Sequence, residues 1–161
     1  MGKQQFYTSL NNESMVRKDD KRIVFRGLLD GVMADICFCA ALAYNEGNAM
    51  LCSRLQELNE CCKAVMSAHV KGTEPVLPKI GGKDLKTLHE MSHDPGKFFG
   101  CGHFLPEPEQ GLALAWLNVL RTGIRDAERA CEEENQGIQN AMNWMSGAVF
   151  VMMCEQISLR K

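Results

Sequence analysis

The positions of the five prolines constrain the fold of this chain more than any other feature. All of them fall between Lys71 and Gln110. Proline interrupts helices because it lacks a backbone N–H and clashes with the preceding turn. The chain is therefore divided into two proline-free regions, residues 22–70 and 111–161, with a proline-bearing middle between them.

Both proline-free regions carry apolar residues at helical spacing, and each contains one turn-rich break. The breaks are expected at residues 45–48 (Asn-Glu-Gly-Asn) and near residues 135–137 (Asn-Gln-Gly). A short fifth helix is expected over residues 83–92. No sheet is expected, because alternation of β-branched and aromatic residues is nearly absent. We therefore predict an all-α fold, an antiparallel four- or five-helix bundle forming a single domain over residues 1–161.

The last predicted helix has one methionine-rich apolar face. Methionine at helical spacing is more often core than interface, and the alternative is an interaction domain that uses this face as a partner surface. The face consists of Ile138, Ala141, Met142, Met145, Val149, Met152 and Ile157.

Composition and charge exclude several classes of function. The formal net charge is −2, so no general basic field attracts nucleic acid or an anionic membrane, and any anion site must be local. The longest apolar run, residues 36–44, is too short to span a bilayer. The N-terminus lacks the apolar core of a signal peptide. Eight cysteines without a CxxC pair lie mostly among apolar residues, which indicates reduced thiols in the core of a cytoplasmic protein.

Three charged residues lie on one face of the third long helix. Arg121, Arg125 and Glu128 fall at i, i+4 and i+7, so they stack on successive turns. Two guanidiniums hold phosphate oxygens, and the carboxylate can hold a metal-bound water or orient a guanidinium. This pattern predicts a polyphosphate site, although a solvated charged face is the alternative. Asp30 lies in an otherwise apolar stretch and needs a partner such as an arginine, and Asn143 on the last helix is grouped with these residues.

Two other segments could contribute to a site. Near the N-terminus, the polar segment of residues 1–20 is expected to wrap phosphates with the hydroxyls of Thr8 and Ser9 and the ammonium of Lys18; a disordered terminus is the alternative. In the middle, residues 97–106 form a glycine-containing aromatic loop. Such a loop can close an apolar wall over a large flat ligand, or it can simply pack onto the bundle. The aromatic residues of the loop considered for that wall are Phe98, Phe99, His103 and Phe104.

A metal site must also be considered. His89 and His93 are four residues apart on the expected short helix, and Cys101 and His103 follow. Such residues are plausible zinc or iron ligands. Histidine pairs at this spacing also occur by chance, so His89, His93 and Cys101 are weak candidates.

Five segments of the chain resemble, in order, the motifs of one family. They are residues 15–30, 84–95, Phe104-Leu105-Pro106, residues 120–128 with Arg121, Arg125 and Ala127-Glu128, and residues 141–153 with Ala141-Met142-Asn143-Trp144-Met145-Ser146. In these motifs the chain resembles the ATP:cob(I)alamin adenosyltransferases of the five-helix-bundle type, and in particular their ethanolamine-utilisation branch.

The resemblance implies a reaction and roles for individual residues. A cob(I)alamin nucleophile attacks the 5′ carbon of ATP, adenosylcobalamin forms and triphosphate leaves, with Mg²⁺ bound through ATP. The family binds ATP between neighbouring subunits of a trimer, and it places an apolar side chain beneath cobalt to exclude the lower base. The implied ATP-binding residues are Thr8, Ser9, Lys18, Arg125, Glu128 and Asn143. At the catalytic site, beside Arg125 and Glu128, Arg121 is implied to pair with Asp30. Cobalamin would be contacted by Phe98, Phe99, His103 or Phe104.

The resemblance also implies partners. A B12-dependent enzyme such as ethanolamine ammonia-lyase would use the product, a reductase would supply the electron, and the protein would lie in the cytoplasm in association with a bacterial microcompartment. One departure leaves an alternative open. Residues 9–13 read Ser-Leu-Asn-Asn-Glu where propanediol-type members carry a Thr-Gly-Asp-Lys-Gly phosphate loop. A non-catalytic corrinoid carrier of the same fold is therefore the second hypothesis.

Overall fold

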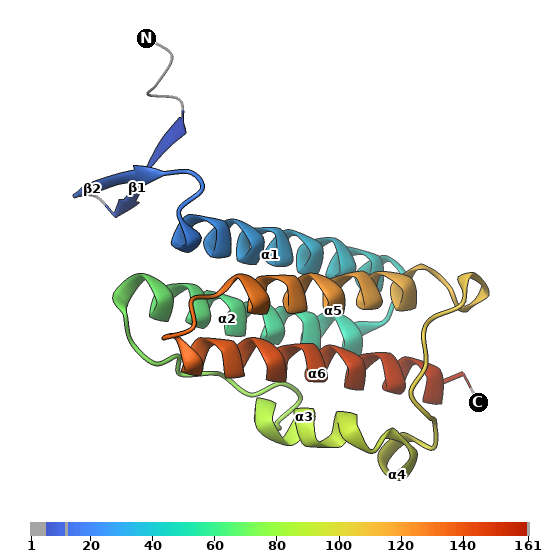
Figure 1. The fold of residues 1–161 in the computed structure, drawn as a ribbon. Helices are drawn as coiled ribbons and strands as arrows, with labels where there is room; N and C mark the ends of the chain where they lie inside the picture. Colours follow the sequence, from blue (N-terminus) through green and yellow to red (C-terminus); the bar gives the residue numbers. More distant parts are fainter. Residues whose placement is uncertain (1–5, 12, 161) are drawn as a thin grey trace.

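The chain folds into a helical bundle preceded by a small hairpin. The computed structural model describes residues 6–11 and 13–160; the rest of the predicted N-terminal segment, residues 1–5 and 12, and residue 161 lie outside that description. In the described part, the bundle is built from four long helices. The first two run in opposite directions, and so do the last two (Figure 1). They are α1 (Lys21–Asn45), α2 (Ala49–Lys71), α5 (Leu112–Ala130) and α6 (Gln136–Ser158). The predicted helical fold is confirmed.

Polar caps set the ends of the first two helices. The Asp20 side chain accepts a hydrogen bond from the Arg22 backbone N–H and begins α1, and the Asn48 side chain accepts one from the Leu51 N–H and begins α2. Each cap satisfies a backbone donor that has no partner within the helix. Gly72, with φ of 66°, ends α2 in the left-handed conformation that glycine adopts without steric cost. The predicted break at residues 45–48 is confirmed.

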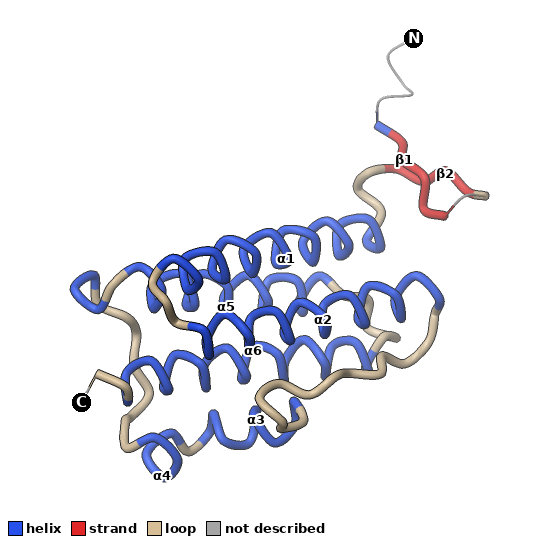
Figure 2. The backbone as a smooth tube through the Cα atoms, turned by 180° about the vertical axis from the view of Figure 1, so that it is seen from behind, coloured by secondary structure: helices blue, strands red, loops and turns tan. Residues whose placement is uncertain are grey.

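The last helix is buried on more sides than predicted. The seven apolar positions of the expected face are buried or half-buried, but every residue from 145 to 154 is buried as well. The reason is that α6 lies centrally, in contact with α5, α3, α2 and α4 (Figure 2). Met142, Met145 and Met152 are at most 1% exposed, so they belong to the core and offer no partner surface. The break before α6 spans residues 131–135, slightly earlier than expected.

The proline-bearing middle forms one wall of the bundle. The expected short helix is α3 (Leu85–His93), capped by Asp84, and it lies along α6. A further short helix, α4 (Pro95–Phe99), takes up the first part of the predicted aromatic loop, because Pro95 suits the first turn and Asp94 caps it. A turn of 3-10 helix, η2 (Pro108–Gln110), leads into α5.

The expectation of no sheet is wrong for the N-terminal segment. Strands β1 (Tyr7–Asn11) and β2 (Ser14–Arg17) pair antiparallel, with Thr8 opposite Val16, and project from the start of α1 (Figure 1). The turn is stabilised by the Asn11 side chain, whose Oδ1 accepts hydrogen bonds from the backbone N–H groups of Glu13 and Ser14 at 3.2 and 2.8 Å. Side-chain hydrogen bonds of this kind build turns in sequences too polar and short to show a strand pattern.

Buried thiols account for most of the cysteines, as predicted. None of the eight forms a disulfide, and Cys39, Cys61, Cys62, Cys131 and Cys154 are buried in the core. Burial raises the pKa of the Cys39 and Cys61 thiols to about 12. Of the described helices, none is both long and apolar enough to cross a membrane.

Candidate functional site

Residues from distant parts of the sequence meet in a cavity of about 350 Å³ between α3, α5, α6 and the loop after α4. We call it the arginine–histidine cavity. Its lining is His89, Ser92, His93, His103, Phe104, Arg121, Arg125, Asn143, Ser146, Gly147 and Phe150. Five of the predicted site residues, Arg121, Arg125, Asn143, His103 and Phe104, therefore lie together.

The charge of this cavity is of one sign. Among the described residues, its lining contains two guanidiniums and three imidazoles but no carboxylate. Burial, followed by repulsion from Arg125, lowers the pKa of Arg121, yet a guanidinium stays protonated at neutral pH because its ordinary value is so high. Arg121 is oriented by Asn118, whose Oδ1 accepts hydrogen bonds from Nε and Nη2 at 3.2 and 3.1 Å. The cavity is therefore suited to an anionic ligand.

An aromatic wall stands in the same cavity. The His103 ring stacks on Phe150 with ring centroids 5.4 Å apart and an interplanar angle of 10°, and the Phe104 ring lies 5.7 Å from Phe150. His103 Nε2 lies 3.1 Å from the Ser92 carbonyl oxygen, which fixes the ring. The cavity thus combines a flat apolar surface with cationic groups, as a ligand with a flat ring system and phosphates requires.

The other two aromatic candidates lie elsewhere. Phe98 and Phe99 line a separate cavity with Met50 and Glu155, at the end of α6. Phe98 is exposed and lies under the Lys97 ammonium, which is 5.2 Å from the ring centroid. The structure therefore brings His103 and Phe104, but not Phe98 and Phe99, to the arginines.

Two histidines of α3 face each other at the cavity. His89 Nε2 and His93 Nε2 are 3.1 Å apart. Burial, and then the neighbouring His93, lower the pKa of His89. Cys101 does not join the pair and instead lies beside Cys154 on α6. Within residues 6–11 and 13–160 no three histidine, cysteine or acidic side chains gather as a metal site would require, so the weak metal prediction gains no support.

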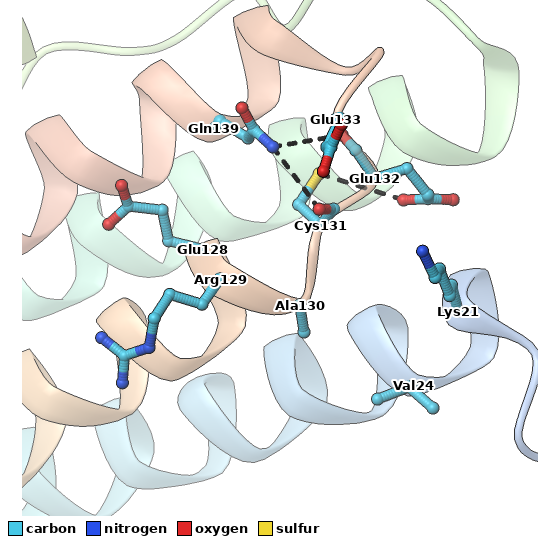
Figure 3. A pocket seen from close by; sticks show the side chains of 9 residues that line it. All are labelled: Lys21, Val24, Glu128, Arg129, Ala130, Cys131, Glu132, Glu133 and Gln139. Carbon is cyan, nitrogen blue, oxygen red and sulfur yellow. Dashed lines mark hydrogen bonds between the residues drawn. The ribbon is translucent and has the colours of Figure 1, made fainter.

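Glu128 lines a second cavity, of about 480 Å³, which we call the glutamate cavity. In Figure 3, Glu128 and Arg129 extend from α5, while Lys21 stands at the start of α1 on the other side. Burial raises the pKa of Glu128 despite the opposing effect of Arg125 and Arg129. Because Glu128 follows Arg125 by one helical turn, the two cavities lie on successive turns of α5. The face of α5 that carries Arg121, Arg125 and Glu128 is therefore divided between the two cavities.

Asp30 and Arg121 do not pair within the chain. Asp30 is exposed on α1, so water solvates its carboxylate and it needs no buried partner. The guanidinium of Arg121 is engaged by Asn118. A pairing between two copies of the chain stays a prediction.

The N-terminal candidates lie on or beside the hairpin and line neither cavity. Thr8 and Ser9 are on β1, and the Lys18 backbone N–H extends the pairing of the strands by donating to the Phe6 carbonyl at 2.9 Å. The hairpin is tied to the bundle by Arg26, whose Nη1 donates to the Leu10 carbonyl at 2.6 Å.

A buried polar network supports that anchor. Arg26 Nε donates to His69 Nδ1 at 3.1 Å, and His69 Nε2 lies 3.1 Å from Glu132 Oε2. Because Nδ1 accepts, the hydrogen bonds place the proton of His69 on Nε2, where it is donated to Glu132. The network joins the hairpin, α1, α2 and the loop before α6. Sequence reasoning missed it, and its only signal was a histidine on the apolar face of α2.

Three lining residues of α6, Ser146, Gly147 and Phe150, were also missed. Ser146 and Phe150 follow Asn143 by three and seven positions, so they lie on its face of the helix. That spacing was the signal that could have found them.

The structure is thus a helical bundle with a cationic, aromatic-walled cavity, and comparison with known proteins shows the family to which such a chain belongs. The family model described as Cobalamin adenosyltransferase matches residues 3–156, and the chain belongs to that family.

Similar proteins are found among curated enzymes. The chain is 30% identical over 155 residues to Corrinoid adenosyltransferase EutT of Escherichia coli (strain K12), and 29% identical to the protein of the same name from Salmonella typhimurium (strain LT2). The match covers 91% of this chain and 57% of each of those proteins, so the chain spans little more than half the length of these relatives. No solved structure gives a significant match.

Proposed function

We propose that this chain transfers the 5′-deoxyadenosyl group of ATP to the cobalt of cob(I)alamin, forming adenosylcobalamin and releasing triphosphate. One observation carries the proposal: a single cavity holds Arg121, Arg125 and Asn143 next to the aromatic wall of His103 and Phe104. The cationic part suits the phosphates of ATP, and the wall suits the corrin ring. Membership of the cobalamin adenosyltransferase family supports the same reaction.

The charges of the cavity match the charge that develops in this reaction. The cobalt(I) electron pair forms a bond to the 5′ carbon of ATP, and the bond from that carbon to the triphosphate oxygen breaks with its electron pair on oxygen. Negative charge therefore grows on triphosphate, where preorganised cations stabilise it more than they stabilise bound ATP. Arg125 is the proposed leaving-group cation. Glu128, one turn further along α5, would hold the Mg²⁺ that accompanies ATP, and the ion would neutralise phosphate charge.

The aromatic wall is assigned to the corrinoid. Phe104 against Phe150, with His103 stacked beside them, forms a surface that excludes water and a lower axial base from beneath cobalt. His103 is held by the Ser92 carbonyl, which keeps its Nε2 engaged within the protein. Without a lower ligand, the cobalt centre accepts an electron more readily.

We further propose that the active form is a homo-oligomer, most simply a trimer. Thr8, Ser9 and Lys18 line neither cavity of their own chain, so they would reach the phosphates only from a neighbouring subunit. Asp30 would pair with Arg121 across the same boundary. In support, α1 exposes the large apolar side chains Val24, Leu28 and Phe38. This exposed apolar surface fits burial against another copy of the chain.

The resemblance to the ethanolamine-utilisation branch extends the proposal to partners. The single domain would act in the cytoplasm, in association with a bacterial microcompartment. Adenosylcobalamin would be passed to a B12-dependent enzyme such as ethanolamine ammonia-lyase, and a reductase would deliver the electron.

One binding experiment and one activity assay separate the enzyme from the non-catalytic carrier. Calorimetry with MgATP should show micromolar binding by the enzyme and none by a carrier. Reduced cobalamin with MgATP should then give the spectrum of an alkylcobalamin that turns base-off in acid. Corrinoid binding that is independent of nucleotide, with no alkylcobalamin formed by folded protein, would establish the carrier instead.

A further inference from the structure

The histidine pair of α3 has no role in the reaction proposed above. The Nε2 atoms of His89 and His93 are 3.1 Å apart, while the ring centroids are 4.6 Å apart. Since the nitrogens are closer than the ring centres, the Nε2 atoms of the two nearly perpendicular rings approach each other. His93 is exposed and His89 is half-buried, so these two atoms are open to a ligand in the arginine–histidine cavity.

The other groups of the cavity decide which ligand chemistry fits the pair. From α5 the pair faces Arg121 and Arg125, and the loop after α4 adds His103. From α6 it faces Asn143 and Ser146, which carry no charge. Two guanidiniums without a carboxylate repel a metal cation and attract an anion.

The surroundings of His89 favour the tautomer that carries its proton on Nε2. Its Nδ1 is buried and has no hydrogen-bond partner among the described residues. Burying an N–H without an acceptor costs more free energy than burying a lone pair that is left unused. The rarity of unpaired buried donors in folded proteins reflects this difference. The ring proton therefore belongs on Nε2, where it points toward His93. A neutral imidazole at His93 can likewise carry its proton on Nε2.

We propose that His89 and His93 bind a phosphate oxygen of the ligand, which accepts a hydrogen bond from each Nε2 and replaces the hydrogen bond between the two rings. The inference rests on the proposed function, since it assumes that phosphate-bearing substrates enter this cavity. Two substrates carry such oxygens: ATP in its triphosphate, and cobalamin in the phosphodiester of its lower loop. Arg121 and Arg125 supply the remaining charge for either one.

The test compares variants of the pair with a matched control. His89→Leu and His93→Leu, singly and together, remove the donors. Lys86→Leu removes an exposed cation from the same helix outside the cavity. His89→Gln with His93→Gln keeps an amide donor at each position and checks that an effect does not come from misfolding. The probes are tripolyphosphate, cobalamin and cobinamide, which lacks the phosphodiester, and binding is measured by calorimetry.

The expected result is a loss of affinity for one phosphate source. Removing two hydrogen bonds to a charged oxygen should weaken binding by roughly tenfold or more in the double leucine variant. Weaker tripolyphosphate binding identifies the triphosphate of ATP as the source. Weaker binding of cobalamin but not of cobinamide identifies the phosphodiester. The glutamine variants should recover part of the affinity, and Lys86→Leu should match the wild type.

Other outcomes would overturn the inference. It is wrong if all three probes bind the wild type and the double leucine variant equally. It is also wrong if the wild type binds Zn²⁺ through the pair and the variants lose only that binding. If either of these results is found and the wild type still forms adenosylcobalamin, the inference about the histidine pair fails and the proposed function stands. If folded wild-type protein forms no adenosylcobalamin, the proposed function itself is refuted.

Discussion

Gly147 sets how closely α3 approaches α6, and so positions the wall that carries the two histidines. A Cβ atom added at Gly147 would lie 2.7 Å from His89 Nδ1, 3.0 Å from His89 Cα and 3.1 Å from Ser92 Oγ. The Cα atom belongs to the α3 backbone and cannot move alone. We therefore predict that Gly147→Ala pushes α3 away from α6. Gly31→Ala in α1 is the matched control, because nothing lies within 4 Å of a Cβ at that position.

The two substitutions should have opposite effects on stability. Overpacking costs about 1–3 kcal/mol, whereas replacing a helical glycine by alanine contributes about 1 kcal/mol, so Gly147→Ala should lose about 1 kcal/mol in net terms. For a chain of this size the melting temperature would fall by roughly 3 °C. Gly31→Ala lacks the overpacking term and should gain up to about 1 kcal/mol.

Urea unfolding of both variants, followed by circular dichroism, measures the difference. The expected gap between them is about 2 kcal/mol in the free energy of unfolding, from the sum of the two effects. Gly147→Ala should also weaken binding of the same probe, tripolyphosphate or cobalamin, that the double leucine variant of the histidine pair binds less tightly, since α3 carries His89. Equal stability of the two variants would show that α3 does not pack on Gly147 as described.

Three further predictions concern the site, the helix cap and the thiols. Arg125→Ala should lower turnover by about 100-fold or more, as loss of a group that stabilises developing charge does. Lys86→Ala, which removes an exposed cation that lines neither cavity, should leave steady-state kinetics nearly unchanged. The Arg22 guanidinium lowers the pKa of Asp20 to about 2. The stabilisation by this cap is therefore complete above about pH 4, where unfolded aspartate is ionised, and is lost as the pH falls toward 2. Asp20→Asn should remove this pH-dependent part of the stability from unfolding curves. A thiol reagent should label exposed Cys37 first in the native protein, and mass mapping should find slow labelling at the five buried thiols, Cys39, Cys61, Cys62, Cys131 and Cys154.

Periodicity and proline placement were sufficient to predict the four long helices and α3, whereas the short helix α4 was expected as loop. The long helices follow from apolar residues at helical spacing, and the break at residues 45–48 follows from the turn-forming residues there. The hairpin could not be predicted in this way. Its turn depends on hydrogen bonds from one side chain, Asn11, and its strands are too short for a periodic signal.

The candidate site was predicted in part because its residues repeat on helix faces. Arg121, Arg125 and Asn143 were identified from spacing and resemblance, and the fold brings them together. The separation of Glu128 into another cavity depends on where α1 and the loop before α6 lie, which spacing on α5 does not contain. The exposure of Asp30 likewise depends on which face of α1 packs inward, and an apolar neighbourhood in sequence did not reveal it.

The activity proposed for this chain is the formation of a carbon–cobalt bond from ATP. The most direct measurement incubates the protein with chemically reduced cobalamin and MgATP and quantifies adenosylcobalamin and triphosphate by chromatography. We predict that the two products form in equal amounts and that Arg125→Ala suppresses both together. Triphosphate without adenosylcobalamin, or neither product from folded wild-type protein, would contradict the account.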